Sequence, residues 1–256
     1  MFLLFGKATM SASRSEGSLS PGRQIRWLEA IIIIAFLCLV AFFFMPIFEK
    51  PWDGNRGRTK SQNNLRQIGL ALIQYQDIHK RLPPRVVYSP DGKPLYSWRV
   101  LILPYIEETP LYEDFHRDEP WDSPHNKRLL SRVPPVYIAP VNRDEPLWFT
   151  HYQAFAGRGT GFEDTQPIRV PDDFPDGTSK TLLVCEAANP VPWSKPEDLV
   201  YEPDKPLPQL GGLYNAGFNA AFGDGSVRLI PRRTKEETIR ALVTRNGHER
   251  VELPDE

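Results

Sequence analysis

The chain has 256 residues and a formal net charge of −1, because 31 Lys and Arg residues nearly balance 32 Asp and Glu residues. Nucleic-acid-binding domains usually carry a strong positive excess, so this balance argues against nucleic acid as a partner. Hydrophobic residues make up 41% of the chain and 26 residues are proline, which favours a packed, loop-rich domain over a long helical bundle. The two cysteines, Cys38 and Cys185, are too few for a disulfide-rich scaffold or a zinc site built of thiolates.

The first 48 residues predict a membrane anchor. Residues 1–29 form a short, serine-rich basic tail, and residues 30–48 follow as an uninterrupted uncharged run. At ~1.5 Å per residue, a helix of that length is about 28 Å long, close to the ~30 Å hydrocarbon core of a bilayer. A cleaved signal peptide is the alternative, but the run is long for one and no small-residue cleavage site follows it. We therefore expect residues 30–48 to remain as a single-pass helix in a lipid bilayer, although basic residues on both sides leave its orientation open.

The rest of the chain divides into a linker and a head. Residues 49–60 contain Pro51, Gly54 and Gly57 and predict a linker that would also interrupt a continuous stalk helix. Residues 61–256 show no internal repeat and predict one head domain.

The head opens with an expected amphipathic helix from about Gln62 to His79. Its apolar side chains recur at positions i, i+3, i+7 and i+10, namely Leu65, Ile68, Leu72 and Tyr75. Short helices are expected after Ser97 and Ser123, which are typical capping residues, and Pro110 and Pro124 suit first helical turns.

The second half of the head predicts mainly strands. They cover residues 147–155, 181–186, 219–222 and 226–230, and the last two flank a Gly-Asp-Gly turn typical of a hairpin. A final helix is expected from Lys235 to Arg245, with Thr234 and Glu237 as its capping box. A helix followed by antiparallel hairpins predicts an α+β fold in which an amphipathic helix packs on an antiparallel sheet.

Six stretches of sequence between about residues 59 and 248 carry a family resemblance. They are NNLRQIGLAL (63–72), SWRVLILPYIE (97–107), FHRDEPWDSPHNKRLL (115–130), DGTSKT (176–181), VPWSKPEDL (191–199) and AFGDGSVRL (221–229). In this order they resemble the planctomycete prepilin-type, processing-associated H-X9-DG family, a domain of unknown function numbered fifteen fifty-nine. The resemblance implies a protein of the cell membrane with a pilin-like head outside the cytoplasm, and it implies no activity.

The sequence departs from the family pattern at two places. The family motif has a His ten positions before the Asp of Asp-Gly, but Tyr214 stands ten positions before Asp224. Prepilin processing needs a Gly at the cut and a Glu five residues on, whereas Glu29 would place the cut after Gln24. We therefore expect the N-terminal segment to be retained and Tyr214 to be a packing residue.

One polar cluster offers residues suited to chemistry. His116, Asp118, Asp122 and His125 could bind a metal or pair an acid with a base. Their spacing fits no zinc-protease pattern, and the prolines among them prevent one helical face from presenting all four. The alternative, which we favour, is a turn whose polar residues cap the next helix while Trp121 packs into the core.

An acidic loop offers a second possible site. Asp172, Asp173 and Asp176 could supply the carboxylate oxygens that calcium prefers, although a solvated turn is the simpler interpretation.

The aromatic residues of the head also allow two interpretations, a sugar-stacking surface or core packing, of which we favour packing. They are Trp98, Trp121, Trp148, Trp193, Tyr96, Tyr105 and Tyr152.

Three function classes therefore stay open. The first is a membrane-anchored structural or interaction protein without catalytic activity or a resident cofactor, acting on a protein partner that the sequence does not identify. The second is a ligand-binding module for a glycan or small molecule, and the third is a metal-assisted hydrolase that uses the 116–125 cluster. The apolar segment and the resemblance favour the first.

Overall fold

The computed structural model of the protein describes residues 29, 31–37, 39, 54–141 and 145–249. The chain separates into two compact units, residues 1–51 and residues 52–256. In the first unit residues 31–37 are helical, whereas the rest of the predicted tail and much of the predicted anchor lie outside the described residues. Within the part of the chain that the structure describes, no helix is both long enough and apolar enough to cross a membrane.

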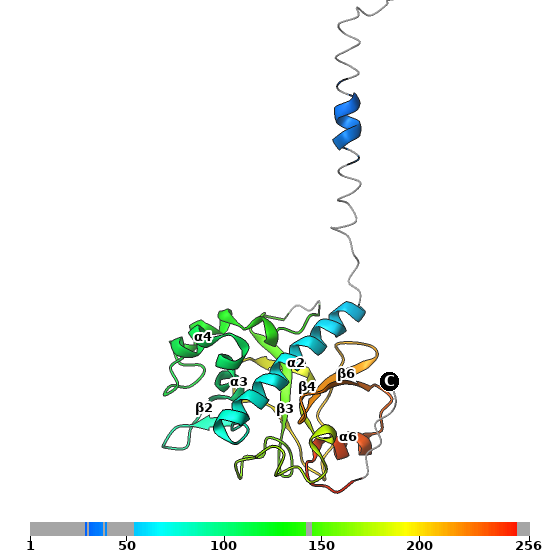
Figure 1. The fold of residues 1–256 in the computed structure, drawn as a ribbon. Coiled ribbons are helices and arrows are strands. Elements are labelled where there is room, and N and C mark those ends of the chain that lie inside the picture. Colours follow the sequence, from blue (N-terminus) through cyan, green and yellow to red (C-terminus); the bar gives the residue numbers. More distant parts are fainter. Residues whose placement is uncertain (1–28, 30, 38, 40–53, 142–144, 250–256) are drawn as a thin grey trace, which may run out of the picture. The chain divides into compact units, whose positions relative to one another are not determined.

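The head begins with a long helix, α2 (Gly54–His79), which lies across one face of a sheet (Figure 1). The predicted apolar stripe is confirmed, since its four side chains, Leu65, Ile68, Leu72 and Tyr75, are all buried.

Helix α2 starts earlier than the sequence predicts. It begins at Gly54 rather than near Gln62, so the predicted linker 49–60 is helical from Gly54 onward. The prediction was wrong because it weighed the low helix propensity of Gly54 and Gly57 alone. Gly57 and Ser61 are buried against the head, and this packing outweighs a local cost of roughly 1 kcal/mol per glycine.

The main sheet is antiparallel with one parallel pair at its edge. Its five strands run in the order β5 (Leu199–Val200), β3 (Phe149–Ala156), β4 (Leu182–Pro192), β6 (Gly217–Phe222) and β7 (Val227–Pro231). Only the pairing of β3 with β5 is parallel. The predicted α+β fold and the β6–β7 hairpin are thus confirmed.

Strand β4 runs six residues beyond the predicted end at Glu186. Its second half pairs with the start of β3, where Phe149 lies opposite Pro192 and Thr150 opposite Val191. Residues 187–190 have weak strand propensity, so this extension depends on pairing across the sheet and not on local preference.

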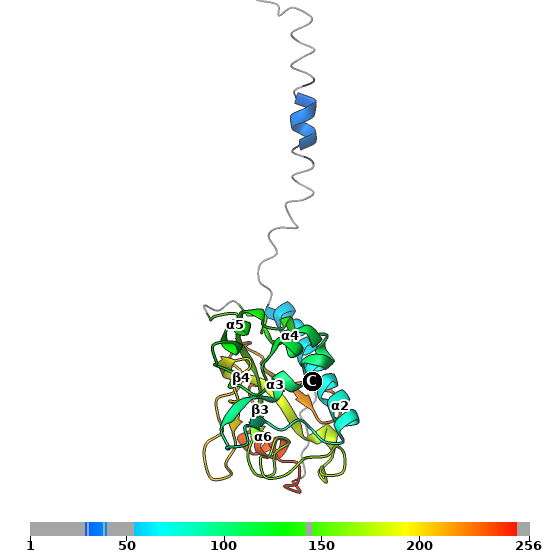
Figure 2. The same ribbon diagram turned by 90° about the vertical axis from the view of Figure 1, so that its left-hand side faces the viewer.

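The sheet lies between two apolar cores (Figures 1 and 2). The core under α2 is completed by shorter elements, and the core on the opposite face is closed by α6 (Glu236–Val243) through Leu242 and Val243. The shorter elements are the hairpin β1 (Val86–Tyr88) and β2 (Pro94–Ser97), the helices α3 (Trp98–Leu101), α4 (Thr109–Asp114) and α5 (Asn126–Leu129), and the 3-10 turns η1 (Leu103–Ile106), η2 (Leu130–Arg132) and η3 (Pro135–Tyr137). A further 3-10 turn, η4 (Thr178–Lys180), precedes β4.

The predicted cap Ser97 is confirmed, because its hydroxyl accepts a hydrogen bond from the Arg99 amide. The Ser123 hydroxyl accepts one from the Asn126 amide, but the N-cap of α5 is His125. The predicted capping box of Thr234 is wrong, because the α6 cap is Lys235 and no side chain caps this helix.

Helix α6 also ends earlier than predicted, at Val243 rather than Arg245. Thr244 is extended and pairs with Thr160 in an isolated bridge. The Arg245 side chain is drawn into a buried ion pair with Glu163, at 2.7 Å, which takes this residue away from a helical position.

Gly217 provides a test of this packing. Its φ is +145°, and a β carbon there would lie 2.0 Å from the carbonyl oxygen of Ile230 on the neighbouring strand. Gly217→Ala should lower the free energy of unfolding by roughly 2–4 kcal/mol, because the added carbon would meet the backbone of a paired strand that cannot move aside. The matched control is Gly69→Ala inside α2, where a β carbon would meet Ala221 at 3.7 Å. It should raise stability by roughly 0.5–1 kcal/mol. Denaturant unfolding in detergent measures both, and equal effects would contradict the close pairing of β6 with β7.

Candidate functional site

A buried polar network joins the first half of α2 to the middle of the sheet. Its centre is Glu186 on β4, whose side chain is completely buried. One carboxylate oxygen accepts hydrogen bonds from the Ser61 hydroxyl of α2 and from the Asn219 side-chain amide at 2.9 Å. The other oxygen accepts the Asn219 backbone amide at 2.7 Å.

Strand β3 adds a further member to this network. The Tyr152 hydroxyl lies 2.7 Å from the Ser61 hydroxyl, and the Asn64 side chain donates to the Tyr152 hydroxyl at 3.3 Å. Residues from one helix and three strands thus meet around one carboxyl group.

Burial governs the protonation of this site. It raises the pKa of Glu186, although the hydrogen bonds from Asn219 and Ser61 act in the opposite direction. Burial also raises the pKa of Tyr152 well above its ordinary value. Because Glu186 has no exposed surface, this carboxyl group is suited to holding α2 on the sheet and not to meeting a dissolved substrate.

Tyr214 lies beside this network. Burial and the nearby Glu186 carboxyl raise the pKa of Tyr214, and its hydroxyl oxygen is buried although the residue as a whole is only half-buried. Tyr214 also forms an isolated bridge with Gly217. Tyr214 is therefore partly packed, which agrees with the packing role that the sequence predicts, and its ring is not fully enclosed.

A second buried cluster surrounds the ion pair of Arg99 and Asp198, whose nearest atoms are 2.6 Å apart and whose side chains are fully buried. The same Asp198 oxygen accepts hydrogen bonds from the Trp98 indole at 3.2 Å and from the Ala154 amide at 3.0 Å. Arg99 also donates to the Tyr152 carbonyl at 3.0 Å. Burial raises the pKa of Asp198, opposed by the Arg99 charge. This cluster ties α3, β3 and the segment before β5 together.

The predicted metal candidates His116, Asp118, Asp122 and His125 do not converge on one point. The two imidazole rings stack, with centroids 3.5 Å apart and planes 3° apart. His116 Nδ1 faces Glu119 at 3.0 Å, and His125 Nε2 faces the Asp114 carbonyl at 2.9 Å. Both aspartates are exposed.

The residue that organises this turn is Asn126, which the sequence alone did not single out. Its completely buried side chain accepts the His116 amide at 2.9 Å and donates to the carbonyls of His116 and Pro120, at 2.9 and 3.0 Å. An Asn at the start of a predicted helix inside a proline-rich turn was the available signal, because such side chains often satisfy turn backbone.

The acidic loop is occupied by arginine and backbone contacts. Asp173 accepts the Arg169 amide at 2.8 Å, and its hydrogen bonds with Arg169 lower the pKa of Asp173. Asp172 lies 4.0 Å from Arg169, and Asp176 accepts the His248 amide at 3.0 Å. Among the described residues no group of three or more His, Cys, Asp or Glu side chains is placed to hold a metal ion, this loop included.

Most of the aromatic residues pack inside the head. Trp98, Trp193 and Tyr152 are completely buried, Trp121 is half-buried, and Trp148 is 39% exposed. Tyr96 is also buried and Tyr105 partly so, which leaves Trp148 as the one Trp of the described head that is more than one-third exposed.

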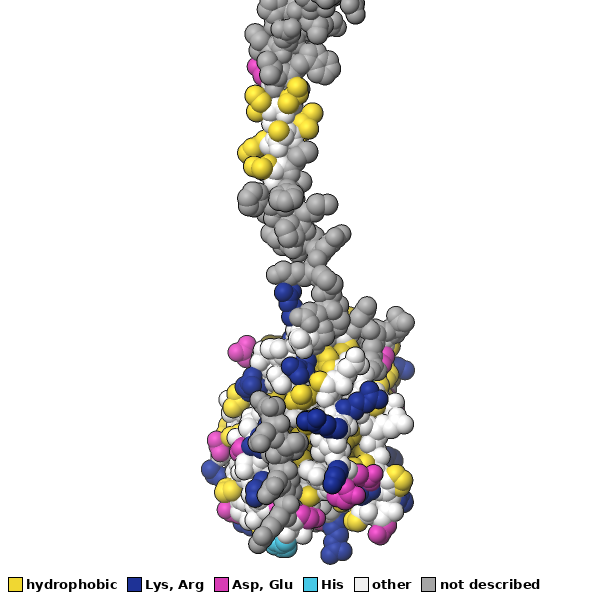
Figure 3. Space-filling model, turned by 90° about the vertical axis from the view of Figure 1, so that its right-hand side faces the viewer, with side chains coloured by type: hydrophobic (Ala, Val, Ile, Leu, Met, Phe, Trp, Pro, Cys, Tyr) yellow, Lys and Arg dark blue, Asp and Glu magenta, His cyan; other side chains and the backbone are white. Residues whose placement is uncertain are grey.

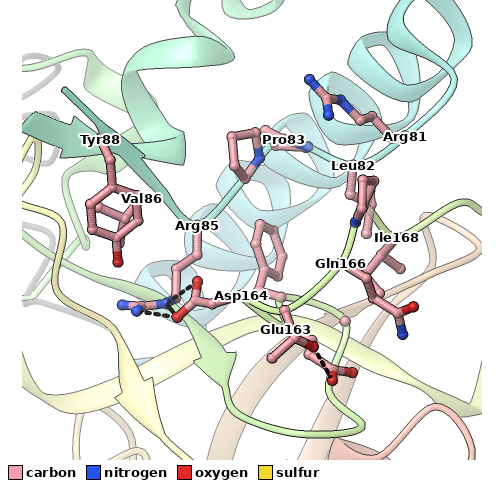
Figure 4. Close-up of a pocket in the computed structure, with 15 residues that line it drawn as sticks. Arg81, Leu82, Pro83, Arg85, Val86, Tyr88, Glu163, Asp164, Gln166 and Ile168 are labelled. Carbon is pink, nitrogen blue, oxygen red and sulfur yellow. Dashed lines mark hydrogen bonds and ion pairs between the residues drawn. The ribbon is translucent and has the colours of Figure 1, made fainter. Parts of the chain in front are cut away.

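A surface cavity of about 260 Å³ lies between the loop that follows α2 and the loop at residues 161–168 (Figure 4). Arg85 forms its charged wall and binds Asp164 in a two-pronged contact of 2.5–3.1 Å. Leu82 joins the two loops by donating its amide to the Ile168 carbonyl at 2.7 Å. Arg81 and Tyr88 lie at the edge and are exposed. This cavity presents charged, aromatic and apolar side chains to a small ligand.

Comparison with known proteins gives one match. Residues 57–146 match the family described as Protein of unknown function (DUF1559). The match runs from the start of α2 to the segment before β3, and it supports the resemblance seen in the sequence over that part of the chain. It ends before Tyr214 and therefore does not test the motif position. No curated protein and no solved structure matches the chain.

The buried carboxyl group predicts a pH dependence. A raised pKa in the folded state means that Glu186 binds a proton more tightly when folded, so its contribution to stability is full below about pH 4.5 and falls as the pH rises through the raised pKa. Glu186→Gln removes this titration. Denaturant unfolding from pH 4 to 8 should therefore show the wild type losing stability relative to the variant as the pH rises. A difference that stays constant with pH would show that Glu186 titrates normally in the folded protein.

The 116–125 turn predicts a contrast between two variants. Asn126→Ala removes the four hydrogen bonds of a completely buried side chain and should cost roughly 2–4 kcal/mol of stability. The control, His116→Ala combined with His125→Ala, removes a stacked pair in which His116 is exposed and His125 is half-buried, and should cost about 1 kcal/mol or less. Stoichiometric zinc or manganese in the purified protein, lost in the double His variant, would contradict this structural role.

Proposed function

We propose that the protein is a single-pass membrane protein whose pilin-like head is displayed outside the cytoplasm as a non-catalytic interaction module. The observation that carries this proposal is the exposure of the N-terminal apolar helix. Ile31, Ile34 and Leu37 are each about 59–60% exposed, and their apolar neighbours are exposed to a similar degree (Figure 3). A helix that is apolar on all sides is stable when it is surrounded by other apolar matter, and a bilayer supplies it.

The head supports the pilin-like part of the proposal. A long first helix that lies on an antiparallel sheet is the arrangement that the family resemblance implies. The apolar segment ends at residue 48 and α2 begins at Gly54, so only five residues separate the proposed anchor from the head helix. Pro51 lies among them, and it disfavours one continuous stalk helix of the kind that pilin filaments use. We therefore propose a tethered head and not a filament subunit.

The contacts of the charged residues support a non-catalytic role. Glu186, Asp198 and Arg99 are enclosed and bonded to backbone or to each other, and the 116–125 cluster is engaged in stacking and turn contacts. These structural roles account for the positions of these residues without a reaction.

A ligand-binding module is the second candidate, and the cavity beside Arg85 favours it. Arg85 is held by Asp164, whereas Arg81 is exposed at the edge with Tyr88, so the cavity offers a cation and an aromatic ring to a small polar ligand.

The proposed topology predicts the result of a protease experiment. Protease added to intact spheroplasts should digest the head and spare the N-terminal tail, whereas a fully protected head would contradict the proposal.

Intact-mass analysis of the membrane-extracted protein is the companion measurement. It should show residues 1–48 still attached, because Gln24 replaces the Gly of a prepilin cut and no signal-peptidase site follows the apolar run. A mature N-terminus at Ile25 or beyond Phe48 would rule out the retained anchor.

A further inference from the structure

Two large apolar side chains are exposed side by side in a turn at the start of β3. Leu147 is 69% exposed and Trp148 is 39% exposed. The Phe149 amide donates to the Pro146 carbonyl at 3.0 Å and closes the turn that presents them. Single exposed apolar residues are ordinary on a protein surface, whereas two adjacent large ones form a small apolar patch that a partner can contact.

The base of this turn is fixed to the sheet. His151 Nε2 lies 2.9 Å from Glu145, and its Nδ1 lies 2.8 Å from the Ala187 carbonyl on β4. The Trp193 amide donates to the Trp148 carbonyl at 2.9 Å. The pair is therefore held in place before any partner binds, which reduces the entropy that binding costs.

The contacts of α2 place this turn at the end of the head where α2 begins. Ser61 contacts Tyr152 and Glu186, which lie opposite each other on β3 and β4. Two turns later, Gly69 faces Ala221, which lies level with Ala154 across the strands of the sheet. Moving toward the start of α2 therefore means moving toward lower residue numbers on β3, and so toward Trp148 and Leu147. Figures 1 and 2 show the first turn of α2 at the upper end of the head.

Basic side chains are exposed at the same end of the head as the apolar pair. Arg56 and Lys60 are exposed on the first turns of α2, one helical turn apart. We call Arg56, Lys60, Leu147 and Trp148 the base surface. The five intervening residues limit the path from Phe48 to Gly54 to about 20 Å, even when fully extended.

We propose that the base surface rests on the headgroup region of the bilayer that holds the anchor, and that it favours anionic lipid. The proposal rests on the proposed function, because it needs residues 30–48 to span that bilayer. Trp is enriched where hydrocarbon meets water, Leu can enter the outer hydrocarbon, and Arg and Lys pair with lipid phosphates. The short tether keeps this end of the head near the lipid, so weak contacts are sufficient to orient it.

The test uses the full-length chain in vesicles of phosphatidylcholine with about one-third phosphatidylglycerol. An environment-sensitive fluorophore is attached at Leu147→Cys in a Cys38→Ser background, in which Cys185 remains because it is buried. The matched control carries the label at Ile78→Cys, an equally exposed apolar position (66%) in the last turn of α2. Lipids brominated near the headgroup then quench whichever label touches the membrane.

The expected result is quenching at position 147 that is at least three-fold stronger than at position 78. Arg56→Glu with Lys60→Glu should weaken it in the anionic vesicles and have little effect in pure phosphatidylcholine, since each basic residue near an anionic surface contributes roughly a five-fold factor in membrane affinity. Equal, weak quenching at both positions would overturn the proposal. A label at position 147 that becomes shielded from water only at high protein density would also overturn the proposal, because it would show that a second copy of the chain covers the surface.

Flotation of the same vesicles after alkaline washing separates the two proposals. Protein that washes away contradicts the anchor, and with it the proposed function. Protein that stays with the vesicles while position 147 remains unquenched contradicts only the docking of the base surface.

Discussion

The hydrogen bonds around Glu186 are the constraint on which the rest of the head depends. Burying a carboxyl group away from water costs several kcal/mol unless its oxygens accept hydrogen bonds. Here Ser61 and Asn219 supply the donors. These donors come from α2 and β6, so the site is satisfied only when the helix sits on the sheet in one register. An apolar contact would tolerate sliding of α2 by a turn, whereas this network does not.

The Arg99–Asp198 pair extends the same principle to the irregular half of the fold. The segment from α3 to η3 has little regular structure, and its short elements cannot be held by their own backbone hydrogen bonds. Arg99 binds backbone carbonyls of β3 and of the segment before β5, and the Tyr137 hydroxyl donates to the Arg99 carbonyl at 2.7 Å. The buried guanidinium thus joins β3 to the segment before β5, a use suited to its five fixed donors, while the backbone carbonyl of Arg99 holds η3. The charges of Arg99 and Asp198 thus hold parts of the fold together.

The sequence predicted the parts of this fold that periodicity and turn chemistry determine. The stripe of Leu65, Ile68 and Leu72 and the Gly-Asp-Gly hairpin are local patterns, and both were confirmed. The start of α2 at Gly54 and the long second half of β4 were missed, because tertiary pairing overrides weak local propensity there. Glu186 was seen only as the end of a strand, since nothing in a single sequence distinguishes a buried carboxylate from an exposed one. The partners of Glu186 lie 33 and 125 residues away, at Asn219 and Ser61.

The distribution of polar and apolar groups suggests how such a head acts. The Arg99–Asp198 ion pair is buried, and the histidines at positions 116 and 125 stack on each other. The surface of the head includes a cavity beside Arg85 and a fixed apolar turn at Leu147 and Trp148. On the proposed five-residue tether the head would have few orientations, and a turn that rests on lipid would reduce them further. The opposite end of α2, with the cavity beside it, would then face away from the membrane, where a soluble partner or ligand arrives. Display of that end would suit the interaction module that we propose, because the buried ionisable groups Glu186, Arg99 and Asp198 are engaged in structural contacts.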